Sequence, residues 1–122
     1  MQSTKIGEHS KTVTSVKFSP TGNLVASASA DGSISICNID TRASSTIMES
    51  SPTPGINQLK WLNSETHIVT ASEDKSVKIF DVEQGQCVLS LNGHRSSVFS
   101  VAVHPDINLV LTGSYDECIR MW

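Results

Sequence analysis

The sequence predicts an all-β fold in which one antiparallel unit is repeated three times. Short apolar segments are separated by turn clusters of Gly, Pro, Asn and Asp, for example at 20–23 and 30–32. Such spacing is typical of strands joined by tight turns. The pattern also returns at intervals of 42 and 43 residues, and a period in the forties indicates four-stranded units that stack on one another.

Three positions define the repeat: an Asp in a turn, a residue 22 positions before it and a residue six positions after it. The last copy, 93–122, begins with Gly-His and closes with Trp, which is typical of the blades of a β-propeller. The three copies carry His9, Asp31 and Cys37, then Pro52, Asp74 and Phe80, then His94, Asp116 and Trp122.

We expect residues 1–122 to form part of a β-propeller with three antiparallel blades of up to four strands each. Residues 1–6 are predicted to be an outer strand of another blade, with its strand at 4–6. Repeat 1 covers 7–50, repeat 2 covers 51–92, and repeat 3 covers 93–122 and lacks its outer strand. The predicted strands lie at 12–19, 24–29, 33–39 and about 45–49, at 55–62, 67–72, 76–81 and 86–91, and at 97–104, 108–114 and 118–122.

The segment 40–54, DTRASSTIMESSPTP, has the composition of a loop. The repeat period nevertheless predicts an edge strand in its middle, because its length matches one outer strand and its connection. Ser and Glu on such an edge discourage pairing with other chains. A flexible tether is the alternative interpretation.

Composition and charge argue against several classes of function. The 12 acidic and 9 basic residues give a net charge of -3, which offers no basic footprint for nucleic acid or for an anionic membrane. The three cysteines, Cys37, Cys87 and Cys118, are odd in number and widely spaced, and the first residues lack the apolar core of a signal peptide. We therefore expect reduced thiols and a protein of the nucleus or cytoplasm.

The chain resembles the WD-repeat β-propeller family over essentially its whole length. More narrowly, TVTSVKFSPTGNLVASASADGSISI, KSVKIFDVEQGQCVLSLNGH and SSVFSVAVHPDINLVLTGSYDECIRMW resemble the first three blades of one scaffold. That scaffold is the WD-repeat core of COMPASS/MLL-type histone H3 methyltransferase complexes. The resemblance implies a protein-interaction subunit of chromatin complexes, with no enzymatic activity, no cofactor and no metal.

The resemblance also implies a structural hydrogen-bond relay of His, Ser or Thr, Asp and Trp in each blade, because a buried carboxylate needs donors. Repeat 3 has all four members, repeat 1 lacks the Trp, and repeat 2 lacks both the His and the Trp. The expected members are His9, Ser27 and Asp31, then Thr70 and Asp74, then His94, Thr112, Asp116 and Trp122.

In the scaffold that the chain resembles, the rim of the central channel takes up an arginine of a partner peptide, held between two aromatic rings. The second aromatic wall belongs to a later blade, outside this chain. Glu73 stands where the family has a shorter acid, and Asn57 where it has a serine. Carried over by position, the peptide-binding residues are Phe99, Ala30, Asn57, Glu73, Tyr115 and Thr14.

Other interpretations of these residues stay open. Phe99 and Tyr115 also suit packing between blades, and Glu73 and Asn57 suit solvated loops. The set of His94, Thr112 and Asp116 has the residue types of a nucleophilic triad, as a propeller-borne hydrolase would need. The same set recurs in the other repeats with some members replaced, however, as is typical of structural groups. A nucleophile also needs access to its substrate, which a buried relay does not give.

Three blades do not close a propeller, which typically has four to eight. The chain is therefore either a segment of a longer propeller or one of two copies that close a six-bladed ring as an isologous dimer. In the second case residues 4–6 would complete the partner's third blade. The expected partner is a histone H3 tail or an arginine motif of a methyltransferase. The alternatives are an adaptor in ubiquitin ligation, RNA processing or cilia, and a non-functional fragment.

Overall fold

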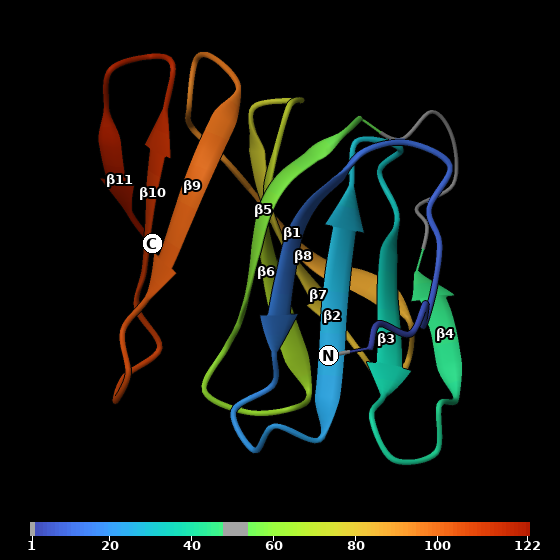
Figure 1. The fold of residues 1–122 in the computed structure, drawn as a ribbon. Coiled ribbons are helices and arrows are strands. Elements are labelled where there is room, and N and C mark those ends of the chain that lie inside the picture. Colours follow the sequence, from blue (N-terminus) through green and yellow to red (C-terminus); the bar gives the residue numbers. More distant parts are fainter. Residues whose placement is uncertain (1, 48–53) are drawn as a thin grey trace.

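The computed structural model describes residues 2–47 and 54–122. Within these residues the chain forms three antiparallel sheets that lie side by side (Figure 1). The strands are β1 (Val13–Phe18), β2 (Leu24–Ser29), β3 (Ile34–Asn38), β4 (Ser44–Ile47), β5 (Ile56–Trp61), β6 (His67–Ser72), β7 (Ser76–Asp81), β8 (Gln86–Asn92), β9 (Val98–Val103), β10 (Val110–Ser114) and β11 (Ile119–Met121).

Each sheet is a meander in which consecutive strands pair, in the orders β1-β2-β3-β4, β5-β6-β7-β8 and β9-β10-β11. The sheets are called blades 1, 2 and 3 below. The inner strands β1, β5 and β9 run next to one another at one edge of the stack (Figure 1). The prediction of an all-β fold with three antiparallel blades is confirmed.

The strand positions follow the prediction closely, and β2, β6 and β7 have the predicted bounds. The edge strand predicted at about 45–49 is β4, which covers Ser44–Ile47, so this part of the segment 40–54 is a strand and not a tether. Residues 48–53, which include Pro52, lie outside the described residues.

Two hydrophobic clusters join the blades. Blades 1 and 2 share a cluster that includes Ile34, Leu59 and Ile68, each with no exposed surface. Blades 2 and 3 share a second one, with Val69, Val77 and Val98 at its centre. Blade 2 is therefore buried on both faces, which explains why the sequence of β6 is apolar on both sides of the strand.

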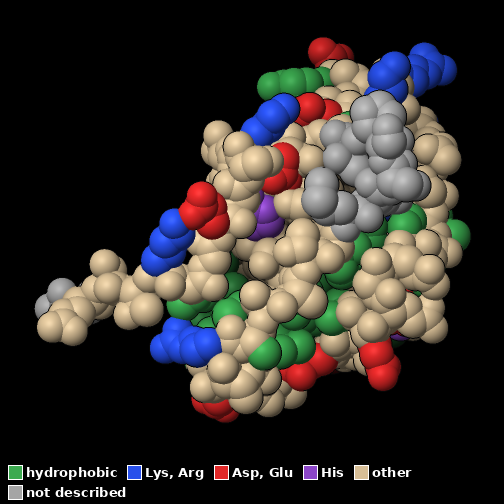
Figure 2. Space-filling view, turned by 90° about the vertical axis from the view of Figure 1, so that its right-hand side faces the viewer, with side chains coloured by type: hydrophobic (Ala, Val, Ile, Leu, Met, Phe, Trp, Pro, Cys, Tyr) green, Lys and Arg blue, Asp and Glu red, His purple; other side chains and the backbone are tan. Residues whose placement is uncertain are grey.

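The outer faces of the stack are apolar but exposed, as the three-blade prediction implies. On blade 1 the exposed fractions are 46% for Val13, 57% for Val16 and 67% for Phe18. On blade 3 they are 80% for Ile119 and 70% for Met121. The view from the β4 side shows hydrophobic side chains at the surface among charges of both signs (Figure 2).

Residues 4–6 are not a strand in this structure. The segment before β1 instead lies against blade 1, where Ile6 and Gly7 line a cavity with Ser35 and Cys37. Because the strand prediction for 4–6 requires a blade of another chain, it stays a prediction. Among the described residues, the structure has no helix with the length and apolar character that a membrane crossing requires.

Candidate functional site: a rim of turns and strand bulges

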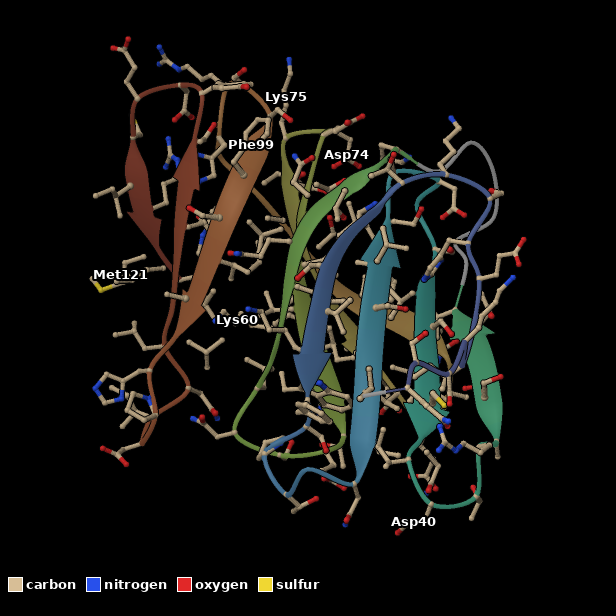
Figure 3. The ribbon with its side chains drawn as sticks, in the orientation of Figure 1. Asp40, Lys60, Asp74, Lys75, Phe99 and Met121 are labelled. Atoms are coloured by element: carbon tan, nitrogen blue, oxygen red, sulfur yellow. The ribbon has the colours of Figure 1, made fainter. Side chains whose placement is uncertain are left out.

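Three of the predicted site residues occupy the same position in successive blades. Ala30, Glu73 and Tyr115 each precede the turn Asp of their blade. Their backbone N–H groups donate to the carbonyl that lies just before the inner strand, at 2.9 Å to Thr12, 2.9 Å to Gly55 and 3.1 Å to Ser97. The three side chains therefore lie along one rim of the stack, at the end where Asp74, Lys75 and Phe99 lie in Figure 3.

The other three predicted residues also occupy equivalent positions. The pairing of each inner strand with its neighbour shifts by one residue, between Val13 and Ser15 in β1, between Ile56 and Gln58 in β5, and opposite Gly113 and Ser114 in β9. A β-bulge of this kind leaves one residue unpaired and redirects its side chain. The bulged residues are Thr14, Asn57 and Phe99.

The polar bulge residues bind the next blade. Thr14 Oγ1 donates to the Ile56 carbonyl at 2.6 Å, and Asn57 Nδ2 donates to the Val98 carbonyl at 2.7 Å. These donors therefore join blades, a role that the sequence analysis did not assign to them. Their part in peptide binding stays a prediction. The amide nitrogen of Asn57 is used between the blades, and its amide oxygen could accept a hydrogen bond from a peptide.

Sequence reasoning missed a second pair of residues that join the blades. Ser15 Oγ accepts the Leu59 N–H at 3.3 Å, and Gln58 Oε1 accepts the Val101 N–H at 2.7 Å. Both side chains follow a bulge residue on the inner strand, 43 residues apart. Polar residues at that repeat position, on an otherwise apolar strand, were the signal that could have identified them.

An exposed aromatic pair marks the blade 3 end of the rim. Phe99 is 40% exposed and Tyr115 is 71% exposed. Their ring centroids lie 4.1 Å apart, with the planes tilted by 53°. The pair sits on the bulge and the turn of one blade, so both rings are held by the sheet and remain accessible.

At the other end of the rim, Gly55 lets the turn of blade 1 approach Glu73. A Cβ at position 55 would lie 3.0 Å from the Ala30 carbonyl oxygen and 3.1 Å from the Glu73 carboxyl carbon. Glu73 is exposed and places a negative charge beside the small Ala30 side chain.

The hydrogen-bond relay is complete in blade 3. His94 Nδ1 lies 2.9 Å from Asp116 Oδ2, and His94 Nε2 lies 2.7 Å from Thr112 Oγ1. Trp122 Nε1 donates to the same Thr112 oxygen at 2.9 Å. Since a carboxylate only accepts, Nδ1 carries a proton, and in the neutral imidazole the Thr112 hydroxyl therefore donates to Nε2. His94 and Thr112 are 6% and 2% exposed, so the relay holds the blade together from inside.

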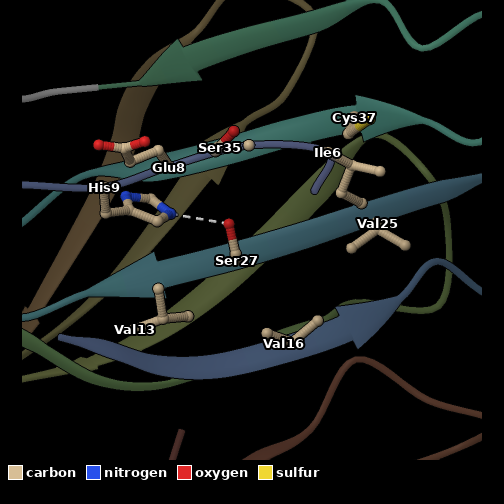
Figure 4. A pocket seen from close by; sticks show the side chains of 10 residues that line it. Ile6, Glu8, His9, Val13, Val16, Val25, Ser27, Ser35 and Cys37 are labelled. Atoms are coloured by element: carbon tan, nitrogen blue, oxygen red, sulfur yellow. Dashed lines mark hydrogen bonds between the residues drawn. The ribbon is translucent and has the colours of Figure 1, made fainter. Parts of the chain in front are cut away.

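Blade 1 builds its relay through an additional serine. His9 Nε2 lies 2.8 Å from Ser27 Oγ (Figure 4), and His9 Nδ1 lies 2.7 Å from Ser33 Oγ. Ser33 Oγ then donates to Asp31 Oδ1 at 2.5 Å, while His9 and Asp31 themselves are 4.0 Å apart. The predicted members His9, Ser27 and Asp31 are thus brought together, with Ser33 as a link that the sequence analysis missed.

Blade 2 replaces the relay by an ion pair. Lys78 Nζ lies 3.1 Å from Asp74 Oδ2, and Ser76 donates to the other carboxylate oxygen from its backbone N–H at 3.0 Å and from its hydroxyl. The Thr70 hydroxyl is buried and has no hydrogen-bond partner within the described residues. The relay of blade 2, which the sequence predicted to lack its His and Trp, therefore does not link Thr70 to Asp74 within the described residues.

The structure argues against a hydrolase at His94, Thr112 and Asp116. The Thr112 hydroxyl is buried and is bonded to both the imidazole and the Trp122 indole. A nucleophile must reach a substrate, and this oxygen is enclosed between two side chains of its own blade.

Acid is expected to destabilise the chain through the turn carboxylates. Burial alone would raise the pKa of Asp116, but hydrogen bonds from the Arg95 and Cys118 backbone and from His94 hold this pKa below its ordinary 3.8. Bonds from Ser33 and Ser10 lower the pKa of Asp31 in the same way. Because both pKa values are lower in the folded state, their stabilisation is complete above the unfolded pKa and is lost as the pH falls below about 3.8.

The free energy of unfolding is measured in urea at several pH values from about 7 down to about 2, for the unmodified chain and for Asp116→Asn. We expect a smaller slope with pH below about pH 4 in the variant. Asp40→Asn, on an exposed turn at the opposite end (Figure 3), is the control and should keep the full slope. An unchanged slope in Asp116→Asn would contradict this account.

The fold and the relay define a stack of propeller blades, and comparison with known proteins agrees. The family model of the anaphase-promoting complex subunit 4 WD40 domain matches residues 16–106. The chain therefore belongs to the WD40-repeat family.

Curated proteins are similar to part of the chain. The chain is 39% identical over 80 residues to the ribosome biogenesis protein WDR12 homolog of Oryza sativa subsp. japonica, covering 56% of this chain and 18% of that protein. It is 40% identical over 76 residues to the human pre-mRNA-processing factor 19, covering 62% and 15%. It is 41% identical over 85 residues to the mouse WD repeat-containing protein 1, covering 68% and 14%. The chain thus spans less than a fifth of the length of these relatives.

Proposed function

We propose that the chain is a non-catalytic interaction scaffold whose rim binds arginine-containing peptides. The observation that carries this proposal is the accessible pair of Phe99 and Tyr115, with centroids 4.1 Å apart, on the same rim as Ala30 and Glu73. Family membership supports a scaffold, because stacked repeats offer continuous surfaces to protein partners.

Arginine suits this rim better than lysine. Its planar guanidinium stacks on an aromatic face and presents a fork of donors at the same time. Stacking on Phe99 contributes about 1–2 kcal/mol when the contact is desolvated. The exposed Glu73 carboxylate and the Asn57 amide oxygen supply acceptors, and the small Ala30 side chain leaves room beside them.

The partner we propose is a histone H3 tail or an arginine motif of a methyltransferase, in a chromatin complex of the nucleus, with the cytoplasm as the alternative location. The resemblance of the three blades to the COMPASS/MLL-type scaffold supports this partner. The acidic balance of the chain, with a net charge of -3, suits a basic peptide.

We propose two ways in which the ring could be completed, and the mass of the purified chain in solution distinguishes them. The exposed apolar faces of blades 1 and 3 fit either a second copy, which would give six blades, or further blades of a longer propeller. Light scattering across a concentration series gives the mass. A dimer with a cooperative melt supports the six-bladed ring, in which residues 4–6 complete the partner's third blade. Aggregates or a monomer would favour the longer propeller.

The test of the rim is a fluorescence-polarisation titration of the closed assembly with an arginine-containing peptide and with the same peptide carrying lysine. Phe99→Ala is expected to weaken arginine binding by about five- to thirtyfold, which corresponds to about 1–2 kcal/mol. Ile107→Ala is the matched control, because Ile107 is 56% exposed and lies between β9 and β10, at the end of blade 3 opposite the rim. Equal losses in both variants, or equal affinity for both peptides, would refute an arginine site.

A second candidate function is an adaptor in RNA processing. The similarity to a pre-mRNA-processing factor and to a ribosome biogenesis protein favours it over ubiquitin ligation or cilia. A closed assembly that binds no arginine peptide would support this adaptor and remove the first proposal.

A further inference from the structure

The rim turn of each blade contains one residue in the left-handed backbone region. This residue directly follows the turn Asp, and it is Gly32 in blade 1, Lys75 in blade 2 and Glu117 in blade 3. Their φ angles are 83°, 74° and 68°. Glycine adopts this conformation readily, whereas a residue with a Cβ adopts it at a cost in stability. Blade 1 therefore has the residue type that the turn favours, and blades 2 and 3 have charged residues in its place.

Contacts within the fold do not account for the charge of Lys75. The side chain is exposed, and within residues 2–47 and 54–122 no hydrogen bond or ion pair involves its Nζ atom. The neighbouring carboxylate of Asp74 is already paired, because Lys78 Nζ lies 3.1 Å from it and the Ser76 N–H donates to it. An unfavourable backbone conformation that serves no contact of its own blade points to a role in binding.

Lys75 lies on the rim that carries the proposed arginine site. It stands two positions after Glu73 on the same turn, and β6, which leads into this turn, lies against β9 of blade 3. Figure 3 shows Lys75 at the same end of the stack as Phe99. A ligand that covers this turn therefore meets a negative charge at Glu73 and a positive charge at Lys75.

We propose that Lys75 selects, among arginine-containing peptides, those that carry an acidic side chain close to the arginine. This inference rests on the proposed function, because it concerns the partner of the same rim. The arginine lies against Phe99 and Glu73, and the carboxylate of the same peptide lies against Lys75 Nζ. An ammonium group is a compact charge on a flexible stem, so it can follow a carboxylate without a fixed orientation.

The spacing of the two charges limits where the acidic residue stands in the peptide. Because Glu73 and Lys75 are two positions apart, their Cα atoms are at most about 7 Å apart. An extended peptide advances by about 3.3–3.6 Å per residue. The acidic residue is therefore expected within about three positions of the arginine.

The experiment is a fluorescence-polarisation titration of the closed assembly at low salt. One arginine peptide is otherwise neutral, and the others carry a single Asp at each successive position on either side of the arginine. At least one Asp peptide is expected to bind about two- to fivefold more tightly than the neutral peptide. This gain should shrink as the salt concentration rises, because salt screens exposed charges.

Two charge variants assign the gain to one side chain. Lys75→Gln should abolish the preference for the Asp peptide. Lys60→Gln is the matched control and should keep the preference, because it removes the same charge from blade 2 but lies away from the rim (Figure 3). No gain for any Asp peptide, or an equal gain in Lys75→Gln and in the unmodified chain, would overturn the proposal.

Glycine variants test the argument from the backbone. Lys75→Gly and Glu117→Gly place at both turns the residue of blade 1, and each is expected to unfold at a higher urea concentration than the unmodified chain. Only Lys75→Gly should also lose the preference for the Asp peptide. A lower urea midpoint in Lys75→Gly would show that the lysine serves the fold and would contradict its role in binding.

The outcomes separate this inference from the proposed function. Arginine binding that depends on Phe99 but is indifferent to an acidic neighbour would remove the role of Lys75 and leave the arginine site in place. Failure of every peptide to bind the closed assembly would refute both.

Discussion

Replacing Thr112 by Val is expected to lower the free energy of unfolding by about 3 kcal/mol. The side chain is 2% exposed, and its oxygen is bonded to His94 Nε2 at 2.7 Å and to Trp122 Nε1 at 2.9 Å. Valine has the same shape but leaves both nitrogens unpaired in the interior, and each unpaired group costs about 1–3 kcal/mol. Urea unfolding followed by circular dichroism measures the change.

Thr70→Val is the matched control, because Thr70 occupies the same position in blade 2 and is 1% exposed. Its hydroxyl has no hydrogen-bond partner in the described part of the chain. Removing it is therefore expected to leave stability unchanged or to raise it by about 1 kcal/mol. Equal losses for the two threonines would show that the relay contributes nothing beyond packing.

Leu59→Ala is expected to cost about 3 kcal/mol and to separate blade 1 from blade 2. Leu59 has no exposed surface and lies in the cluster shared with Ile34 and Ile68. Truncation removes apolar burial and leaves a cavity, for which the usual cost is about 2–5 kcal/mol. Its backbone N–H also donates to Ser15 of blade 1, so a shift of the strand would weaken that bond as well.

Leu111→Ala makes the same chemical change on the outer face of blade 3, where Leu111 is 40% exposed. We expect its cost to stay below about 1 kcal/mol. The two variants are compared by urea unfolding under the same conditions. A loss of similar size in both would mean that the interface between blades 1 and 2 is no tighter than the open face.

The sequence was sufficient for the strands because their signals are local. The second strands, Leu24–Ser29 and His67–Ser72, are apolar runs bounded by turn residues, and the repeat period confirmed each one by its copies. The edge strand Ser44–Ile47 has no apolar pattern of its own, and the period alone predicted it. The relay of blade 3 was predicted in full because all its members are present.

Contacts between blades were not predictable from one sequence. Thr and Asn side chains suit solvent, a bound peptide or a carbonyl of the next blade equally well, so the residue types of Thr14 and Asn57 do not reveal their surroundings. The register of the bulge decides which of these each side chain faces. The link through Ser33 and the ion pair of Lys78 with Asp74 depend on distances across a turn. Side chains that compensate for a missing relay member are set by geometry, not by a motif.

The bonds between inner strands give the stack a direction. Thr14 and Ser15 of blade 1 engage the backbone of β5, and Asn57 and Gln58 of blade 2 engage the backbone of β9 in the same way. Through these four bonds a blade contacts its successor with side chains and its predecessor with backbone, whereas the Trp61 indole N–H, which donates to the Lys17 carbonyl of blade 1, runs the other way. Such nearest-neighbour coupling makes stability a sum of blade and interface contributions. Blade 2, which has two interfaces, should therefore exchange its amide hydrogens most slowly, and opening should proceed inward from both ends of the stack.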